Sequence, residues 1–229
     1  MSKSENEERE QRILDAAAKL FVHYGYDKTT VSDIAREAAV SKGAIYLHFD
    51  SKDALFEGLL LRETLRYQKR WLDLIDADPQ GGTIGAMYKN VLYALNSSAF
   101  MAAIFKQDQR ILGAYLRKPD NLFRQQEPST RYVFVNMMQE AGAMRQDIDP
   151  KVVAHIMNML AYGLVAMDEI MEKSQIPPTD AIIEEIAELM DRALTPDDGG
   201  NSEAGKAVVR QISDAVRQQF EMTGKISQE

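Results

Sequence analysis

The stretch Thr29–Leu55, TTVSDIAREAAVSKGAIYLHFDSKDAL, decides the fold of this 229-residue chain. Thr30 and Asp33 have the spacing of a capping box, which predicts the start of a short helix. Ser41 is a typical N-cap and predicts a second short helix at about 42–48. Two short helices joined by a tight turn predict a helix-turn-helix, whose second helix enters the major groove of DNA.

Nine residues of this stretch are candidate DNA contacts. The start of the second helix is where side chains reach base edges. Lys42 there can donate to guanine O6 or N7, and Gly43 has no side chain that would keep the backbone away from DNA. Most of the others carry donors suited to phosphate oxygens. The candidates are Thr29, Thr30, Ser41, Lys42, Gly43, Ala44, Tyr46, His48 and Lys52.

Three of these residues also have ordinary structural interpretations. Tyr46 could pack in the core, but Ile45 and Phe49 already supply the inward face. His48 fits a phosphate contact and a capping role equally well. Lys52 could be a solvated surface charge, but its place at a helix start inside the motif favours a phosphate contact.

Apolar spacing is helical in nearly all of the chain. Residues 13–24 carry one apolar stripe, including Tyr24, and Gly25 follows as a helix C-cap. A long helix begins at Asp50 or Ser51 and reaches about residue 75. Prolines and glycines separate further helices expected at about 83–97, 99–117, 129–145, 150–173 and 179–194, and an amphipathic segment follows at 203–222. The expected fold class is all-α.

Charge and composition exclude several classes of protein. The chain has 27 basic and 35 acidic residues and a net charge of −8, which disfavours a surface that is basic all over. Residues 1–52 hold only nine of the acidic residues, against eight basic ones, so a local DNA-binding face is compatible with this balance. The absence of cysteine excludes disulfides, thiolate nucleophiles and cysteine-ligated zinc.

Neither a membrane location nor an enzymatic site is expected. The longest apolar run, Ala99–Phe105, is far shorter than the ~20 residues of a membrane-spanning helix, and the N-terminus lacks the pattern of a secretory signal, so we expect a cytoplasmic protein without membrane contact. The three histidines lie far apart and have no metal-ligand spacing. Without a glycine-rich phosphate loop or a nucleophile elbow, we expect no catalysis, metal or cofactor.

The quoted stretch closely resembles the N-terminal signature of the TetR family of bacterial transcriptional regulators. The preceding Ile13–Phe21 (ILDAAAKLF) and Tyr24–Tyr26 (YGY) resemble it too, so the resemblance covers roughly residues 9–56. It implies an all-α homodimer that has a helix-turn-helix domain for a palindromic operator in double-stranded DNA. The larger C-terminal helical domain would dimerise and accept a small ligand that releases the DNA.

One position departs from the family pattern. Ala39 stands in the turn where the family usually has glycine. If this residue adopts a positive φ, alanine costs roughly 1 kcal/mol because its Cβ crowds the carbonyl oxygen.

We expect three segments: a DNA-binding domain at 1–52, a ligand-binding and dimerisation domain at 53–196, and a linker with an amphipathic helix at 197–229. Aromatic and thioether side chains in the second segment suit an apolar cavity, although they fit a filled core as well. They carry no clustered charge, so the expected effector is small and hydrophobic or aromatic. The candidate ligand contacts are Trp71, Phe100, Met101, Phe105, Phe134, Met138 and Met157.

The segments 150–173 and 179–194 are apolar on too many faces for exposed helices. Two such helices from each subunit would form a four-helix bundle across a two-fold axis, and a single-chain core is the alternative. The candidate interface residues are Met167, Ile186, Leu189 and Met190.

The sequence thus predicts a ligand-responsive transcriptional regulator, a repressor, that binds its operator as a homodimer and is released by a small, mainly apolar effector. The rival is a ligand carrier or helical interaction protein that no longer binds DNA. Ala39 and the weak basic balance are the only hints of that rival.

Overall fold

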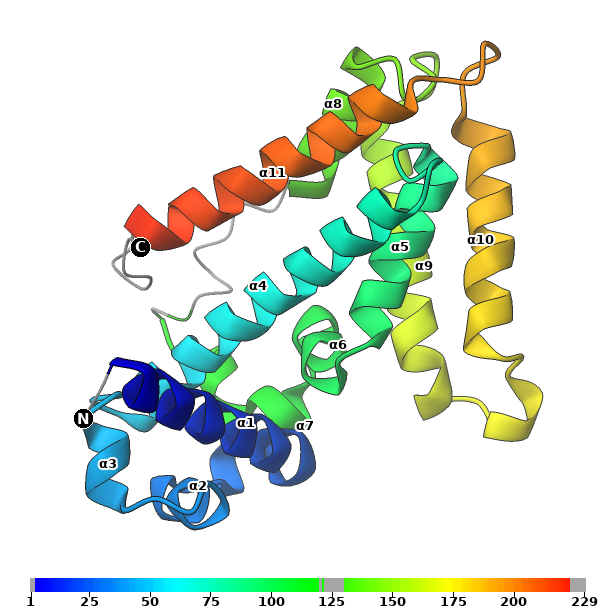
Figure 1. Cartoon of the computed structure of the whole chain (residues 1–229). Coiled ribbons are helices and arrows are strands. Elements are labelled where there is room, and N and C mark those ends of the chain that lie inside the picture. The colour runs from blue at the N-terminus through cyan, green and yellow to red at the C-terminus, as the bar shows by residue number, and fades with distance from the viewer. Residues whose placement is uncertain (1–2, 120, 122–129, 223–229) are drawn as a thin grey trace. The chain divides into compact units, whose positions relative to one another are not determined.

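The computed structural model describes residues 3–119, 121 and 130–222, and every regular element in these ranges is a helix (Figure 1). The chain forms two compact units that alternate along the sequence. The first unit comprises Met1–Thr64 and Ala99–Gln126, and the second comprises Leu65–Ser98 and Glu127–Glu229. The all-helical fold expected from the sequence is confirmed over the described residues.

The first unit contains the predicted helix-turn-helix. Its elements are α1 (Lys3–Lys28), α2 (Val31–Glu37), α3 (Lys42–Tyr46), the first half of α4 (Lys52–Ala77), α6 (Ala99–Lys106), α7 (Gln109–Leu112) and the 3-10 helix η1 (Gly113–Arg117). Helix α3 ends two residues before the predicted end at 48. Ser51 caps α4, because its Oγ accepts from the Ala54 amide at 3.0 Å.

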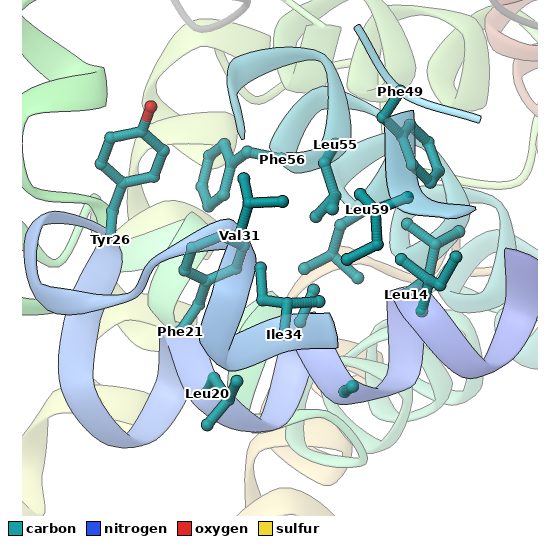
Figure 2. Packing of buried hydrophobic residues seen from close by; sticks show 14 of the residues in the cluster. Leu14, Leu20, Phe21, Tyr26, Val31, Ile34, Phe49, Leu55, Phe56 and Leu59 are labelled. Carbon is teal, nitrogen blue, oxygen red and sulfur yellow. The ribbon is translucent and has the colours of Figure 1, made fainter. Parts of the chain in front are cut away.

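The core of the first unit is built from the apolar stripes of α1, α2 and α4 (Figure 2). Phe21 and Phe56 lie edge to face, with ring centroids 5.1 Å apart. Ile34 lies beside them and is fully buried. Each such side chain contributes about 1.5–3 kcal/mol of hydrophobic stabilisation, so this core fixes the positions of α2 and α3.

Two details of α1 differ from the sequence prediction. Tyr24 is exposed and lies outside the buried stripe. Gly25 has φ 81° and interrupts the helix, as a C-cap glycine does, but the chain resumes helical geometry to Lys28. A side chain at Gly25 would collide with the backbone oxygen of Arg110, so a close approach of α7 also requires glycine here.

The single helix expected at 99–117 is wrong. It is broken at Gln107, which has φ 51°, and Asp108 then caps the short α7. The break brings Phe100, Leu112 and Tyr115 into the core of the first unit. Packing therefore groups 99–126 with the N-terminal helices, whereas the functional division at 1–52, 53–196 and 197–229 stays a prediction.

The second unit contains the second half of α4 and five further α-helices. These are α5 (Ile84–Asn96), α8 (Thr130–Glu140), α9 (Pro150–Ala166), α10 (Thr179–Leu194) and α11 (Ser202–Met222), with 3-10 turns η2 (Met167–Glu169) and η3 (Lys173–Gln175) between α9 and α10. Helix α10 packs along α5, and α8 packs against α9 and α11 (Figure 1).

Local capping explains most of these boundaries. Asp149 caps α9 with Pro150 at its first position, and Thr83 caps α5. Helix α10 has the predicted bounds, whereas α9 is shorter than the predicted 150–173 because 3-10 turns begin at Met167. Position 129, where the sequence predicted a helix to begin, lies outside the described residues. None of the described helices combines the length and apolarity needed to cross a membrane.

Candidate nucleic-acid interface and ligand site

Two local caps hold the helix-turn-helix in place. The Thr30 hydroxyl accepts from the Asp33 amide at 3.1 Å, and the Asp33 carboxylate accepts from the Thr30 amide at 3.2 Å. The Thr30 hydroxyl also donates to Asp33 Oδ2 at 2.6 Å, and this hydrogen bond, with the one from the Thr30 amide, holds the pKa of Asp33 below its usual range. In α3, Ser41 Oγ accepts from the Ala44 amide at 3.1 Å. Thr30, Ser41 and Ala44 therefore fix the helix starts, whether or not they also contact DNA.

The turn between the helices adopts the conformation that the missing glycine indicated. Ala39 has φ 55°, in the left-handed region, and the next amide, of Val40, donates to Ala35 O at 2.9 Å. The turn keeps the backbone geometry that connects α2 to α3. Because Ala39 has a Cβ that crowds the carbonyl oxygen, this conformation is less favourable than it would be for glycine.

The outer face of α3 presents Lys42, Gly43, Tyr46 and Leu47. Tyr46 is 46% exposed, so its core interpretation is wrong, and Leu47 is 80% exposed. Lys42 Nζ lies 5.9 Å from the centre of the Tyr46 ring. Sequence reasoning missed Leu47. The available signal was that Ile45 and Phe49 already fill the inward face, which leaves Leu47 pointing outward.

Gly43 has no internal reason to be glycine. A Cβ built on it would lie 3.8 Å from Ser41 Oγ, an ordinary contact, and its backbone is helical. The open space at the start of α3 is therefore available to a close external surface.

Two candidate phosphate contacts turn inward. Thr29 is 2% exposed, and its hydroxyl donates to Gly25 O at 2.8 Å and contacts Leu20 O at 3.3 Å, so it has no free donor to offer. The side chain of His48 is almost completely buried, with Nδ1 3.5 Å from Glu10 Oε2. Both side chains serve the packing of α1 rather than an outer face.

The amino group of Lys52 makes contacts within the protein itself. Its amino group donates to Tyr26 O at 2.6 Å and lies 4.0 Å above the Tyr26 ring. Burial lowers the pKa of Lys52. The neighbouring Asp53 accepts from the Tyr26 hydroxyl and from Lys118, so a polar cluster joins α4 to α1 and the end of η1. The sequence analysis did not predict this polar cluster.

The seven candidate ligand residues divide between the two units. Phe100, Met101 and Phe105 belong to α6 in the first unit. Phe100 is buried there, with its ring centroid 5.9 Å from that of Phe56. Its role is core packing. The other four residues belong to the second unit.

The structure brings those four residues into one neighbourhood of α4, α5, α8 and α9. The indole Nε1 of Trp71 donates to Met87 O at 3.2 Å, and the Trp71 and Phe134 ring centroids lie 6.3 Å apart. The Tyr88 hydroxyl donates to Met157 O. Met138 and Met157 are fully buried.

Polar groups that the sequence did not single out lie in the same unit. Burial raises the pKa of Tyr67 to about 12, and the same cause raises the pKa of Tyr88 to about 12. The positive charge of Arg131 opposes both shifts, so its guanidinium acts on both phenols. Arg131 thus adds a positive charge near these buried phenols.

The candidate interface residues do not all face the same way. Leu189 is 66% exposed and Met167 is also exposed, whereas Met190 is 6% exposed and Ile186 is buried. On α9, an exposed apolar row runs along the helix: Val152, Ile156, Met159 and Tyr162. Sequence reasoning placed these helices correctly but could not separate their inner and outer faces.

No three histidine, aspartate or glutamate side chains gather as a metal site in the described ranges. Residues 13–59, from α1 to the first turns of α4, match the family described as "Bacterial regulatory proteins, tetR family". Over this segment the chain is similar to the TetR family. The segment matched includes both helices of the helix-turn-helix and the strained turn at Ala39.

Similar proteins include HTH-type transcriptional regulators and a receptor protein. The A-factor receptor protein of Streptomyces griseus is 28% identical over 160 residues, which are 69% of this chain and 54% of that protein. The regulator TtgR of Pseudomonas putida is 38% identical over 98 residues, 42% of this chain and 45% of that protein. YuxN of Bacillus subtilis is 35% identical over 88 residues, 38% of this chain and 29% of that protein. The chain thus spans from under a third to about half of these relatives, which are regulators or receptors and not enzymes.

Solved TetR-type structures share the fold. FadR from Bacillus subtilis in complex with stearoyl-CoA superposes with a TM-score of 0.59 at 19% identity, covering 79% of this chain and 96% of that one. A gamma-butyrolactone receptor described as ArpA-like superposes with a TM-score of 0.56 at 18% identity, covering 92% of this chain and 99% of that one. The helical arrangement of the TetR fold therefore extends beyond the N-terminal domain.

Proposed function

We propose that this chain is a ligand-responsive transcriptional repressor that binds a palindromic operator as a homodimer. The observation that carries the proposal is the outer face of α3. Lys42, Gly43 and Tyr46 lie exposed there on a short helix that is held by its own cap and by the core beneath it. A basic group, an open backbone and a phenol at the start of a helix suit entry into the major groove.

The proposed contacts divide into base readout and phosphate binding. Lys42 reads a base edge, and Gly43 lets the backbone approach the DNA. Ser41 and Tyr46 bind phosphates, as does the part of the Lys52 amino group that does not donate to Tyr26 O. The Thr30 hydroxyl already donates to Asp33 Oδ2 at 2.6 Å, so Thr30 caps α2 instead. Leu47 adds an apolar surface suited to a thymine methyl group. Thr29 and His48 support the domain from within.

Dimerisation through α9 and α10 would place two such domains on one operator. Val152, Ile156, Met159 and Gly163 follow a spacing of four, three and four residues along α9, which is the seam of packed helices. A Cβ at Gly163 would meet nothing within 4 Å, so a neighbouring helix has room to approach. On α10, the exposed Leu189 would join this interface. The two-fold axis of a homodimer matches a palindromic operator.

The effector site is proposed among Trp71, Phe134, Met138 and Met157 in the second unit. Aromatic rings and thioethers there suit a small apolar or aromatic ligand. A relative is named as the receptor of A-factor, and a structure of the same fold holds stearoyl-CoA, which supports a ligand-responsive regulator. A ligand that binds better to the DNA-free form weakens DNA binding by the same factor.

An electrophoretic mobility shift on DNA flanking the protein's own coding region tests the proposal. We expect a sequence-specific complex with wild type, a weaker one with Lys42→Ala, and release by a hydrophobic compound. Trp71→Ala should keep the complex and lose the release. A protein that binds hydrophobic compounds but no DNA would instead be the carrier that the sequence left open.

A further inference from the structure

The side-chain amide of Asn90 in α5 is buried without a hydrogen-bond acceptor for its nitrogen in the described part of the chain. It is 4% exposed, and its amide nitrogen Nδ2 has no hydrogen-bond partner among the described residues. Buried amide donors are paired in nearly all proteins, because an unpaired one keeps the cost of leaving water without compensation. This side chain is therefore a donor without an acceptor.

The neighbours of Asn90 on its face of α5 are small. Ala86 and Ala94, one turn before and one turn after Asn90 on the same helix face, are both buried alanines. Asn90 thus places a polar amide on a buried helix face that is otherwise lined by small apolar residues.

Asn90 also lies next to the proposed ligand site. Met87, whose carbonyl oxygen accepts from Trp71 Nε1, is three residues before it, on the adjoining turn of the helix. Trp71 in turn lies edge to face with Phe134. The unpaired amide thus lies within one helix turn of Met87, whose carbonyl oxygen the indole of this aromatic pair contacts.

A positive charge acts on buried groups of the same unit. Arg131 acts on the buried phenols of Tyr67 and Tyr88, and Tyr88 is the next residue after Met87. A donor and a nearby cation together favour an oxygen that accepts hydrogen bonds.

We infer that Asn90 determines the chemistry of the effector, by donating its side-chain amide to a carbonyl or carboxylate oxygen of an otherwise apolar ligand that lies against Trp71 and Phe134. The inference rests on the ligand site of the proposed function and specifies its ligand class. A hydrocarbon would leave the amide unpaired, whereas an oxygen-bearing ligand satisfies it. Sites built to pair a polar group discriminate strongly against ligands that lack the partner.

Matched probes test this discrimination by calorimetric titration without DNA. 2-Acetylnaphthalene and 2-naphthoate carry the oxygen, and 2-isopropylnaphthalene replaces the carbonyl by an alkyl carbon of similar shape. A second set with decyl chains, a methyl ketone, a carboxylate and an alkyl chloride, covers extended ligands. We expect wild type to bind the oxygen-bearing member of at least one set about tenfold more tightly than its apolar match. The ketone and carboxylate arms show how much Arg131 contributes.

Asn90→Leu should abolish this preference and retain binding of the apolar probes. The control is Asn96→Leu in the same helix, where the wild-type amide already donates to Leu92 O at 2.9 Å and the preference should stay unchanged. In the ligand-free protein, Asn90→Leu should raise the melting temperature because it removes an unpaired donor, whereas Asn96→Leu should lower it. Asn90→Ala serves for the binding comparison if the leucine variant does not fold.

The inference is overturned if wild type binds no oxygen-bearing probe, shows no preference for one, or keeps the preference in the Asn90 variants. These titrations do not involve DNA, so a failure to bind the operator would remove the regulator proposal and leave the preference intact. Operator release by apolar and oxygen-bearing probes alike would support the regulator and remove the role of Asn90.

Discussion

The amino group of Lys52 lies 4.0 Å above the ring of Tyr26 and donates to the backbone oxygen of the same residue at 2.6 Å. Tyr26 follows the kink at Gly25, and Lys52 begins α4, so one contact joins the end of α1 to the helix that follows the DNA-reading element. Lys52, which we predicted from its position in the motif to contact phosphate, thus also links two helices of its own domain.

Lys52→Ala should therefore lower both stability and DNA affinity. The loss of the cation–π contact and the hydrogen bond should reduce the free energy of unfolding by about 1–2 kcal/mol. Binding should weaken for all DNA sequences alike, and the salt slope should fall by about one unit per site. Urea unfolding and binding titrations at several salt concentrations measure the two effects.

Lys42→Ala is the matched comparison. Its side chain is exposed on α3, so stability should stay unchanged, while binding should lose about 1–3 kcal/mol mainly at one base pair of each half-site. Operator variants substituted at single positions locate that base pair. Equal behaviour of the two lysine variants across salt and operator series would contradict this division of roles.

Gly43→Ala should separate folding from DNA binding. The backbone is helical and the added methyl group meets only ordinary contacts, so alanine should stabilise α3 by about 0.5–1 kcal/mol. The same methyl group would stand between the backbone and DNA, so operator affinity should fall. Thermal unfolding and the mobility shift assay check the two directions, and unchanged affinity would show that DNA does not approach here.

Ala39→Gly should stabilise the protein by about 0.5–1 kcal/mol, because glycine adopts φ 55° without steric cost. The control is the adjacent Ala38→Gly. Ala38 has φ −77°, which alanine adopts freely, so glycine there should destabilise by about 0.5–1 kcal/mol. Urea unfolding curves of the two variants should shift in opposite directions. A loss of stability in both would mean that the turn is not strained.

The exposed and buried neighbours on α10 distinguish assembly from folding. Leu189→Glu places a charge on the outer apolar surface and should yield a folded monomer. Met190→Glu buries an unpaired charge and should yield unfolded or insoluble protein. Sedimentation and circular dichroism report the two outcomes. A wild-type chain that sediments as a folded monomer at micromolar concentration would contradict the proposed dimer.

The capping carboxylate of Asp33 should make part of the stability depend on pH. Hydrogen bonds from Thr30 hold its folded-state pKa below the unfolded value of about 3.9, so the unfolded chain binds the proton more readily. The contribution is fully present above about pH 4 and is lost as the pH falls through the lower folded-state pKa. The stability difference between wild type and Asp33→Asn should shrink between neutral pH and pH 3, as urea unfolding would show. A constant difference would mean that the cap is not electrostatic.

The sequence by itself determined where the short helices begin and which family the N-terminal domain resembles. Capping is a local interaction, so Thr30, Asp33 and Ser41 were sufficient to predict where α2 and α3 begin. The family's usual glycine at position 39 raised the question of a positive φ there, and the structure shows that Ala39 has φ 55°.

Tertiary structure decided which side chains face inward and which helices share a core. Thr29 has the same hydroxyl as its exposed neighbour Thr30, and contacts with α1 turn both Thr29 and His48 inward. Phe100 belongs to the first unit because it packs against Phe56, and the amide of Asn90 is unpaired because of what packs around α5. The burial of a side chain and the pairing of its polar atoms depend on residues distant in the chain. The spacing of neighbouring residues in the sequence therefore does not predict them.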